Sequence, residues 1–311
     1  MHLLVVGAGD VGRWFAGVAA TDGPVTAVTF ADVDGAVATA AADELAAAGG
    51  GPARDACRGL AVAELPPVHD GETSDDARDD TAGGTGEEPG DVVGRGAYDA
   101  VCVAVPLPAA GDAIAAHAPR ASAAVVDVTG AMVDPLAAMA AAAPDRERAS
   151  FHPLFAPEAA PGTVAVATDA DGPAVAALRD ALADAGNDLV AVGAAEHDDA
   201  MRTVQGRAHA AVLAFALAAS EDDVPADLAT PVYERLAGLV ERVTGGNPRV
   251  YADIQDAFGG AGDVAAAAAR LADADHDEFA ALYAEARDAG GAGDAVGAGD
   301  REDDPHAGRE R

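Results

Sequence analysis

A histidine in a short proline-containing segment is the first feature of this sequence that could do chemistry. His152 lies in the segment SFHPLFAP (150–157), at the end of an expected strand. In an open α/β sheet, ligands bind outside the carboxyl ends of the strands, which is where His152 would lie. Because the pKa of imidazole is close to neutrality, a histidine there can exchange a proton with a substrate. The position therefore favours a catalytic role for His152 over a purely structural one.

Polar side chains in the second half of the chain could complete a site around this histidine. Gln205 and His209 are four residues apart, so a helix would place them on one face. Arg242 follows on the next expected helix and offers a fixed cation with paired donors for a carboxylate. His197, in the triplet Glu196-His197-Asp198, is expected to have a structural role at a helix start. For His209, a substrate contact and a buried helix position both stay open.

A glycine-rich segment near the N-terminus predicts a dinucleotide site. The pattern G-x-G-x-x-G is formed by Gly7, Ala8, Gly9, Asp10, Val11 and Gly12. Because the chain has 36 glycines, the pattern alone is weak evidence, and a near copy at 260–265 is interpreted as a helix start. The first copy follows an apolar strand, opens a helix and precedes a strand that ends at Asp32. In that arrangement the glycines admit a pyrophosphate at the helix N-terminus, and the acid binds the ribose hydroxyls.

The acids at the end of the second strand also indicate which dinucleotide is bound. Asp32 and Asp34 repel a 2′-phosphate, and no arginine lies between them. NAD is therefore the expected cofactor in preference to NADP, and no metal is expected. The alternative for this segment is a glycine-rich turn that binds nothing.

The composition excludes several kinds of partner and mechanism. The net charge is −34, and the 19 basic residues are all arginine. Such a polyanion repels phosphate backbones and anionic lipids, so neither nucleic acid nor membrane is an expected partner. The lack of lysine excludes Schiff-base chemistry and a lysine general base. The same composition resembles proteins of halophilic microbes, in which molar salt screens the charge. Two cysteines and the lack of a targeting segment indicate a cytoplasmic protein.

Apolar runs and alanine-rich stretches alternate over the first 194 residues. The runs are short and rich in valine, as in strands buried on both faces, and lie at 3–8, 25–31, 98–105, 123–128, 163–168 and 189–194. The alternation predicts an α/β fold, with an N-terminal Rossmann-type, doubly wound parallel sheet followed by an all-helical C-terminal domain. We expect a dinucleotide-binding domain at 1–194, a helical domain at 195–289, and disordered acidic segments at 66–96 (an insertion) and 290–311 (a tail).

Four motifs together resemble those of the prephenate dehydrogenases. The 150–157 segment is similar to the family's His-Pro-Met-Phe-Gly-Pro motif, with Ala156 in place of the glycine. Residues 196–209 resemble the start of the family's helical dimerisation domain, and 230–242 and 250–254 resemble later stretches of it. Together with the nucleotide turn, these motifs occur in the same order and spacing, which makes the likeness more specific than any one of them.

The resemblance implies the activity and the roles of individual residues. It implies a monofunctional NAD-dependent enzyme, without a chorismate mutase or regulatory domain, that converts prephenate to 4-hydroxyphenylpyruvate and carbon dioxide in tyrosine biosynthesis. By position, His152 matches the catalytic histidine, which takes the ring hydroxyl proton as hydride leaves C4. Arg242 matches an arginine that holds a prephenate carboxylate, and Gln205 and His209 match the substrate side. Thr129 is expected to supply the hydroxyl for which the family often has a serine. The helical domain would bind substrate and form a homodimer.

Other functions stay open at this point. Arogenate differs from prephenate by an amino group in place of the keto oxygen, and the sequence does not decide between them. The β-hydroxyacid dehydrogenases have the same two-domain organisation, but they use a catalytic lysine that this chain lacks. A non-catalytic NAD-binding regulator would need the fold but not the pair of His152 and Arg242.

Overall fold

The computed structural model describes residues 1–21, 23–48, 51–68, 96–219 and 225–291 of the 311-residue chain. Most of the predicted insertion at 66–96 and of the predicted tail at 290–311 lies outside these residues. The chain divides into two units, Met1–Gly259 and Gly260–Arg311, each of which is described by itself. The domain limits expected from the sequence, with a boundary at residue 194, stay a prediction.

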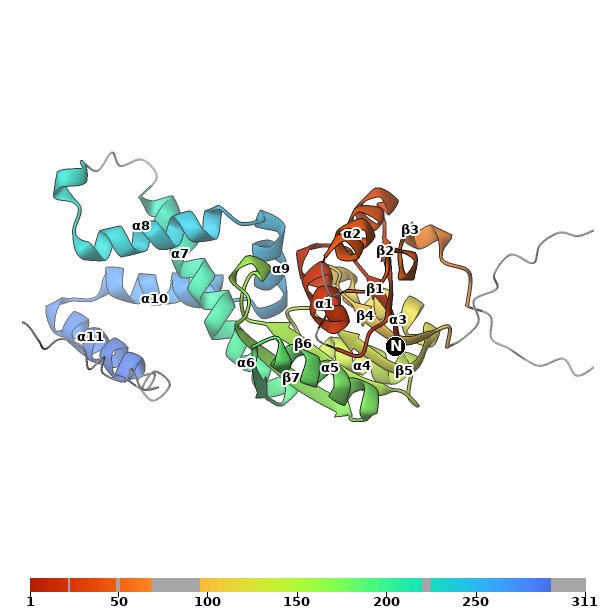
Figure 1. The fold of residues 1–311 in the computed structure, drawn as a ribbon. Helices are drawn as coiled ribbons and strands as arrows, with labels where there is room; N and C mark the ends of the chain where they lie inside the picture. The colour runs from red at the N-terminus through yellow and green to blue at the C-terminus, as the bar shows by residue number, and fades with distance from the viewer. Residues whose placement is uncertain (22, 49–50, 69–95, 220–224, 292–311) are drawn as a thin grey trace, which may run out of the picture. The chain divides into compact units, whose positions relative to one another are not determined.

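An eight-stranded sheet forms the centre of the first unit (Figure 1). The strands are β1 (His2–Val6), β2 (Ala27–Asp32), β3 (Cys57–Ala61), β4 (Tyr98–Val103), β5 (Ala121–Asp127), β6 (Glu147–Pro153), β7 (Thr163–Ala170) and β8 (Asp188–Ala191). Their order is β3-β2-β1-β4-β5-β6-β7-β8, and neighbours run parallel except for β6 and β7, which are antiparallel. The chain order switches direction between β1 and β4, so a ligand crevice is expected at the carboxyl ends of these strands. The predicted Rossmann-type fold is confirmed, although the β6–β7 pair and strand β3 were not predicted.

Helices cover both faces of the sheet because its strands are apolar on both faces. Leu3 and Val5 of β1 pack in one core with α1 (Asp10–Thr21), α2 (Gly35–Ala47) and α5 (Pro173–Asp184). Leu4 and Val6 point to the opposite face, where they pack in a second core with α3 (Ala110–His117) and α4 (Val133–Ala142). Full burial of each such side chain contributes about 1.5–3 kcal/mol, so these two layers hold the strand ends in fixed positions.

Helical segments follow the sheet within the first unit, as the sequence predicted. They are α6 (Ala194–Met201), a π-helix (Arg202–Arg207), α7 (Ala208–Ala218), α8 (Pro231–Thr244) and α9 (Pro248–Phe258). Helix α9 was not predicted; its Ile254 and Phe258 pack with Met201 and against Ala131. The close approach of the π-helix to the end of α9 requires a glycine at position 206, since a Cβ there would lie 2.2 Å from the Gly259 carbonyl oxygen.

The second unit contains α10 (Ala261–Asp273) and α11 (His276–Gly291), which are joined by an ion pair of 2.7 Å between Arg270 and Glu285. Helix α10 begins directly after Gly260, so the near copy of the glycine pattern is a helix start, as predicted. Short 3-10 turns lie at Arg54–Ala56, Val62–Glu64, Leu107–Ala109, Ala118–Arg120, Pro157–Ala159 and Ala226–Leu228. No helix in the described part of the chain is long and apolar enough to cross a membrane.

Candidate active site

The glycine-rich turn joins β1 to α1 at the point where the strand order switches direction. Gly7 has a φ of 100°, and a Cβ there would lie 2.2 Å from the Ala104 carbonyl oxygen. A Cβ on Gly12 would lie 2.3 Å from the Gly7 carbonyl oxygen. Both positions therefore need glycine for packing. A Cβ on Gly9 would meet nothing within 4 Å, so this part of the turn faces open space at the N-terminus of α1, where a pyrophosphate could lie.

Asp32 is fixed beside this turn at the end of β2. Its Oδ2 accepts a hydrogen bond of 2.8 Å from the Ala8 backbone, and its Oδ1 accepts one of 3.1 Å from the Asp34 backbone. Arg13 donates to the Ala8 carbonyl oxygen and forms an ion pair of 2.6 Å with Glu44. Because Glu44 neutralises this neighbouring arginine, the surroundings of Asp32 favour a ribose with free hydroxyls over one with a 2′-phosphate.

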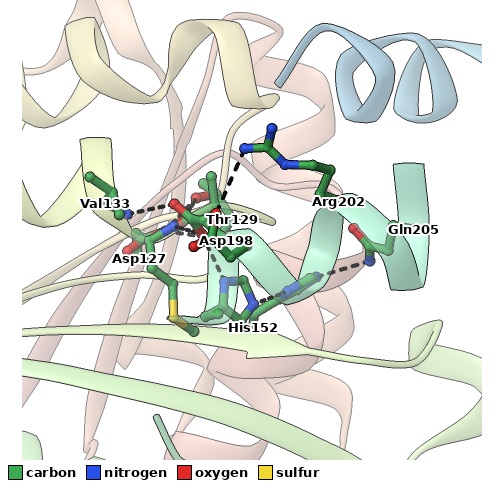
Figure 2. A network of polar contacts seen from close by, with 11 residues as sticks. Asp127, Thr129, Val133, His152, Asp198, Arg202 and Gln205 are labelled. Atoms are coloured by element: carbon green, nitrogen blue, oxygen red, sulfur yellow. Dashed lines mark hydrogen bonds and ion pairs between the residues drawn. The ribbon is translucent and has the colours of Figure 1, made fainter. Parts of the chain in front are cut away.

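His152 lies at the end of β6 and is the first member of a chain of hydrogen bonds (Figure 2). Its Nδ1 is 2.8 Å from Nε2 of His197, and Nδ1 of His197 is 2.8 Å from Oδ1 of Asp198. His152 is 7% exposed and His197 is 2% exposed, so water has little access to either ring. Burial, and repulsion by His197, lower the pKa of His152 to about 3, so this imidazole is neutral at neutral pH.

Asp198 anchors the other end of this chain to the start of α4. Its Oδ1 and Oδ2 accept hydrogen bonds of 3.0 Å each from the backbone N–H groups of Met132 and Val133. Burial by itself would raise the pKa of Asp198, but the hydrogen bonds from His197, Val133 and Met132 outweigh it and lower that pKa. Asp198 is therefore ionised, and the N-terminus of α4 stabilises its charge.

Gln205 and His209 each have a buried polar atom without a partner among the described residues. Nε2 of Gln205 lies 3.5 Å from Nε2 of His152, while Oε1 of Gln205 is buried and unpartnered among the described residues. Nδ1 of His209 is likewise buried without a partner in the described part of the chain, and its ring packs edge-on against Tyr251. Burial lowers the pKa of His209. Buried polar atoms of this kind normally have partners, so their arrangement suits a polar ligand.

Thr129 and Asp127 form a buried pair at the end of β5. The Thr129 hydroxyl donates to Oδ2 of Asp127 over 2.5 Å, and the Thr129 backbone N–H donates to the same oxygen over 2.9 Å. Burial raises the pKa of Asp127 to about 6, although the hydrogen bonds from Thr129 oppose this shift. The Thr129 hydroxyl, which we expected beside His152, therefore donates its hydrogen bond to Asp127.

Arg242 is not brought to His152 in this structure. It lies on α8, which packs on α7, and its side chain is exposed. It forms no hydrogen bond or ion pair with any residue that the structure describes, so its expected role in substrate binding stays a prediction. Arg202, by contrast, extends from the start of the π-helix close to the His152 cluster, with Asp199 3.7 Å from its guanidinium group (Figure 2).

The chain is similar in sequence to a protein of known activity. No family model matches the chain. A curated 4-amino-4-deoxyprephenate dehydrogenase from Streptomyces pristinaespiralis is 34% identical over 217 residues, which span 64% of this chain and 73% of the relative. The chain belongs to the prephenate dehydrogenase family.

Solved structures of prephenate and arogenate dehydrogenases have the same fold. Prephenate dehydrogenase from Aquifex aeolicus, in complex with hydroxyphenyl propionate and NAD+, aligns with a TM-score of 0.58 and 14% identity, over 95% of this chain and 96% of that one. Arogenate dehydrogenase from Synechocystis aligns with a TM-score of 0.54 and 14% identity, over 95% and 99% of the two chains. At this identity the likeness concerns the fold alone.

One departure from the motif of prephenate dehydrogenases has a simple explanation in the backbone. Ala156 stands in place of the motif's glycine, and it adopts a φ of −77° and a ψ of 142°. Every residue type adopts these values, so the local backbone does not need a glycine. Ala156 is also exposed, and the following Pro157 begins a 3-10 turn, where its missing N–H costs nothing.

The contacts of two residues in the His152 cluster could not be read from the sequence. His197 was expected to have a structural role and Asp198 was given no role of its own, and the structure shows that together they form the hydrogen-bonded chain behind His152. The available signal was the triplet Glu196-His197-Asp198 itself, which opens a helix in the region that resembles prephenate dehydrogenases. Nothing in the sequence indicates that its second residue turns inward to the end of β6.

Proposed function

We propose that this chain catalyses the NAD-dependent oxidative decarboxylation of prephenate to 4-hydroxyphenylpyruvate and carbon dioxide, a step of tyrosine biosynthesis. The observation that carries the proposal is the neutral, buried imidazole of His152, whose Nε2 lies 3.5 Å from the amide nitrogen of Gln205. A dehydrogenase that oxidises a ring alcohol needs such a base beside the ring hydroxyl. Membership of the prephenate dehydrogenase family supports the same reaction class.

The residues of the glycine-rich turn fit NAD. The open space at Gly9 and the N-terminus of α1 suit the pyrophosphate, and Asp32 suits the adenosine ribose. The cofactor would run along the segment formed by Gly7, Ala8, Gly9, Asp10, Val11 and Gly12. When bound, NAD supplies the acceptor for the hydride that leaves C4 of the substrate ring. The solved Aquifex aeolicus prephenate dehydrogenase is itself a complex with NAD+, which supports this choice.

The remaining predicted residues would position the substrate. Nε2 of His152 would accept the proton of the 4-hydroxyl group, while Gln205 and His209 would hydrogen-bond polar groups of the substrate through their unpartnered atoms. Arg242 is our proposal for the carboxylate-binding arginine, and Arg202 is the alternative because it lies near the His152 cluster. Thr129 would act through its hydrogen bond to Asp127. The helical region would form a homodimer in a cytoplasmic, salt-adapted enzyme.

A second candidate substrate is 4-amino-4-deoxyprephenate, favoured by the name of the curated relative. This compound carries an amino group in place of the 4-hydroxyl group. The Nε2 lone pair of His152 accepts from an N–H as well as from an O–H, so the cluster does not exclude it. Arogenate, which keeps the ring hydroxyl but has an amino group on its side chain, is the third compound to compare.

The test is NADH formation with each of these three substrates, in molar potassium chloride, with NAD and then NADP. We expect the highest kcat/KM with prephenate and NAD. A higher kcat/KM with the 4-amino compound or with arogenate would move the assignment to that substrate. No turnover of any of the three would overturn the proposed function.

A further inference from the structure

The His152 cluster contains more than a base, because two further groups continue the line of hydrogen bonds behind it. His152, His197 and Asp198 are joined by two contacts of 2.8 Å, and the last carboxylate rests on the start of α4. We propose that His197 and Asp198 act as a proton relay that fixes the tautomer of His152 and takes up the charge when His152 accepts the substrate proton. The proposal rests on the proposed function, and it assigns His197 and Asp198 as positioning residues.

The tautomer follows from the direction in which each hydrogen bond must run. An ionised Asp198 can only accept, so Nδ1 of His197 carries a proton and donates it. In the proposed relay the resting His197 is neutral, so its Nε2 accepts and Nδ1 of His152 donates. His152 is thereby left with a lone pair on Nε2. That nitrogen lies beside Gln205. Gly130 borders it as well, because a Cβ at position 130 would lie 3.7 Å from it.

The relay also explains how the imidazole of His152 could act as a base although it is buried. His152 is buried and has no carboxylate in direct contact, and burial outweighs the favourable effect of Asp198, so a positive charge on its own ring is unfavourable. On His197 the same charge would lie 2.8 Å from the carboxylate of Asp198. Two short proton transfers therefore put the charge where the protein already holds a counter-charge.

The step balances in atoms and charge. The substrate O–H bond breaks as a proton binds Nε2 of His152, while the Nδ1 proton of His152 passes to Nε2 of His197. C4 loses its hydride to the nicotinamide and becomes a carbonyl carbon. The carboxylate on C1 then leaves as carbon dioxide, and its bonding electron pair enters the ring, which becomes a phenolate. The relay runs backwards and returns the proton to the phenolate oxygen, so His152, His197 and Asp198 regain their starting states.

Two variants separate a relay from a structural contact. His197→Gln keeps a polar group opposite Nδ1 of His152 but cannot take up a proton. We expect kcat to fall about 100-fold, with KM and NAD affinity unchanged, since general-base contributions are typically about 10²–10⁴-fold. In Asp198→Asn the imidazolium of His197 loses its counter-charge, so the acidic limb of the kcat–pH curve should move to lower pH. Near-wild-type kcat and an unmoved acidic limb in both variants would overturn the relay.

Other titratable groups around the cluster are controlled separately. Asp127 on β5 titrates in an accessible range, and the Asp199–Arg202 pair lies on the neighbouring helix. If the acidic limb of the kcat–pH curve belongs to the relay, Asp127→Asn and Arg202→Gln should leave it in place. A limb that moves in Asp127→Asn would assign the limb to the Asp127 carboxyl group instead. His276→Gln, which removes an exposed histidine at the start of α11, is the matched histidine control.

A measurement without substrate distinguishes failure of the relay from failure of the proposed function. In protein labelled with nitrogen-15 at histidine, we expect the His152 ring to carry its proton on Nδ1, with the signal assigned by its loss in His152→Asn. A proton on Nε2 instead would overturn the relay even in an active enzyme. Conversely, the expected tautomer in a protein that turns over none of the three substrates would leave the hydrogen-bond assignment standing while the proposed reaction fails. Asp198→Asn that does not fold would leave His197→Gln and the tautomer as the deciding results.

Discussion

The nucleotide turn and the His152 cluster both lie at carboxyl ends of strands, but they are built in different ways. The turn is one continuous segment, and its requirements are steric: Gly7 and Gly12 are glycines because a Cβ would collide with backbone atoms. The cluster combines the end of β6, the start of α4 and helix α6, which are far apart in the sequence. A contiguous site can be recognised by its pattern, whereas a site assembled by tertiary contacts can be recognised only residue by residue.

Two aspartates at strand ends show the same difference in their electrostatics. Asp32 after β2 is half-buried, and each of its oxygens accepts a backbone hydrogen bond. Asp127 after β5 is fully buried, and its Oδ1 has no partner among the described residues. The first carboxylate is held in place by these hydrogen bonds, and the second has a pKa raised to about 6 by burial. The following predictions test whether the two regions can be altered independently.

The largest effect is expected from His152→Asn in the His152 cluster. If His152 accepts the hydroxyl proton, its contribution appears in the transition state, so kcat should fall by about 10²–10⁴-fold while KM hardly changes. Steady-state kinetics over a range of pH checks this. Protonation of His152 should then abolish activity in the wild type, and its lowered pKa should place that acidic limb below the ordinary histidine value of 6.5. The limb should vanish in the variant. Near-normal turnover would refute the role of His152.

Arg242→Gln should act on substrate binding rather than on the chemical step. Loss of a charged hydrogen bond to a carboxylate should cost about 2–4 kcal/mol, which appears as a raised KM for prephenate. NAD affinity, measured by titration without substrate, should not change. Arg202→Gln is the matched comparison. If it raises KM more than Arg242→Gln does, the carboxylate-binding arginine is on the π-helix instead.

Asp127→Asn should change stability in a pH-dependent way. The pKa of Asp127 is raised in the folded protein, so the stability this group contributes is full below its unfolded pKa of about 4 and is lost as pH rises through about 6. Relative to wild type, the variant should gain about 1–3 kcal/mol in unfolding free energy between low pH and pH above 7. Denaturant unfolding at fixed high salt measures this. A pH-independent difference would show that Asp127 is not buried as described.

The smallest effect is expected in the nucleotide region from Asp32→Ser. We expect the unmutated enzyme to prefer NAD over NADP by at least about tenfold in kcat/KM, which corresponds to about 1.4 kcal/mol. The variant should lose most of that preference and keep its acidic limb. Equal use of both cofactors by the unmutated enzyme would show that Asp32 does not face the ribose.

Most of the fold could be predicted because buried parallel strands have a clear sequence pattern, namely short valine-rich runs. Strand β3 has the sequence CRGLA, of which only Leu60 is buried, so it gave no such signal. The antiparallel pairing of β6 with β7 depends on tertiary register, which composition does not reveal. Helix α9 was hidden because the stretch that precedes it, Gly245-Gly246-Asn247-Pro248, is read as an interruption rather than as the cap of a helix.

In the candidate site, residue types could be predicted but contacts could not. His152 and Gln205 were singled out individually, and the structure places their Nε2 atoms 3.5 Å apart. Thr129 was expected to face His152, but a hydroxyl beside a buried carboxylate bonds to that carboxylate first. The inward direction of His197 depends on how α6 docks on α4, through Asp198, and no local pattern encodes that.

The π-helix between α6 and α7 contains about one more residue per turn than an α-helix. In an α-helix each residue turns by about 100°, so positions 197 and 205 would point about 80° apart. A π turn uses about one extra residue, which reduces this difference to about 20° and lets both His197 and Gln205 reach His152. Here one additional residue in the turn brings two side chains of one continuous helical segment to the same imidazole, so the site depends on the register of the helix as well as on its side chains.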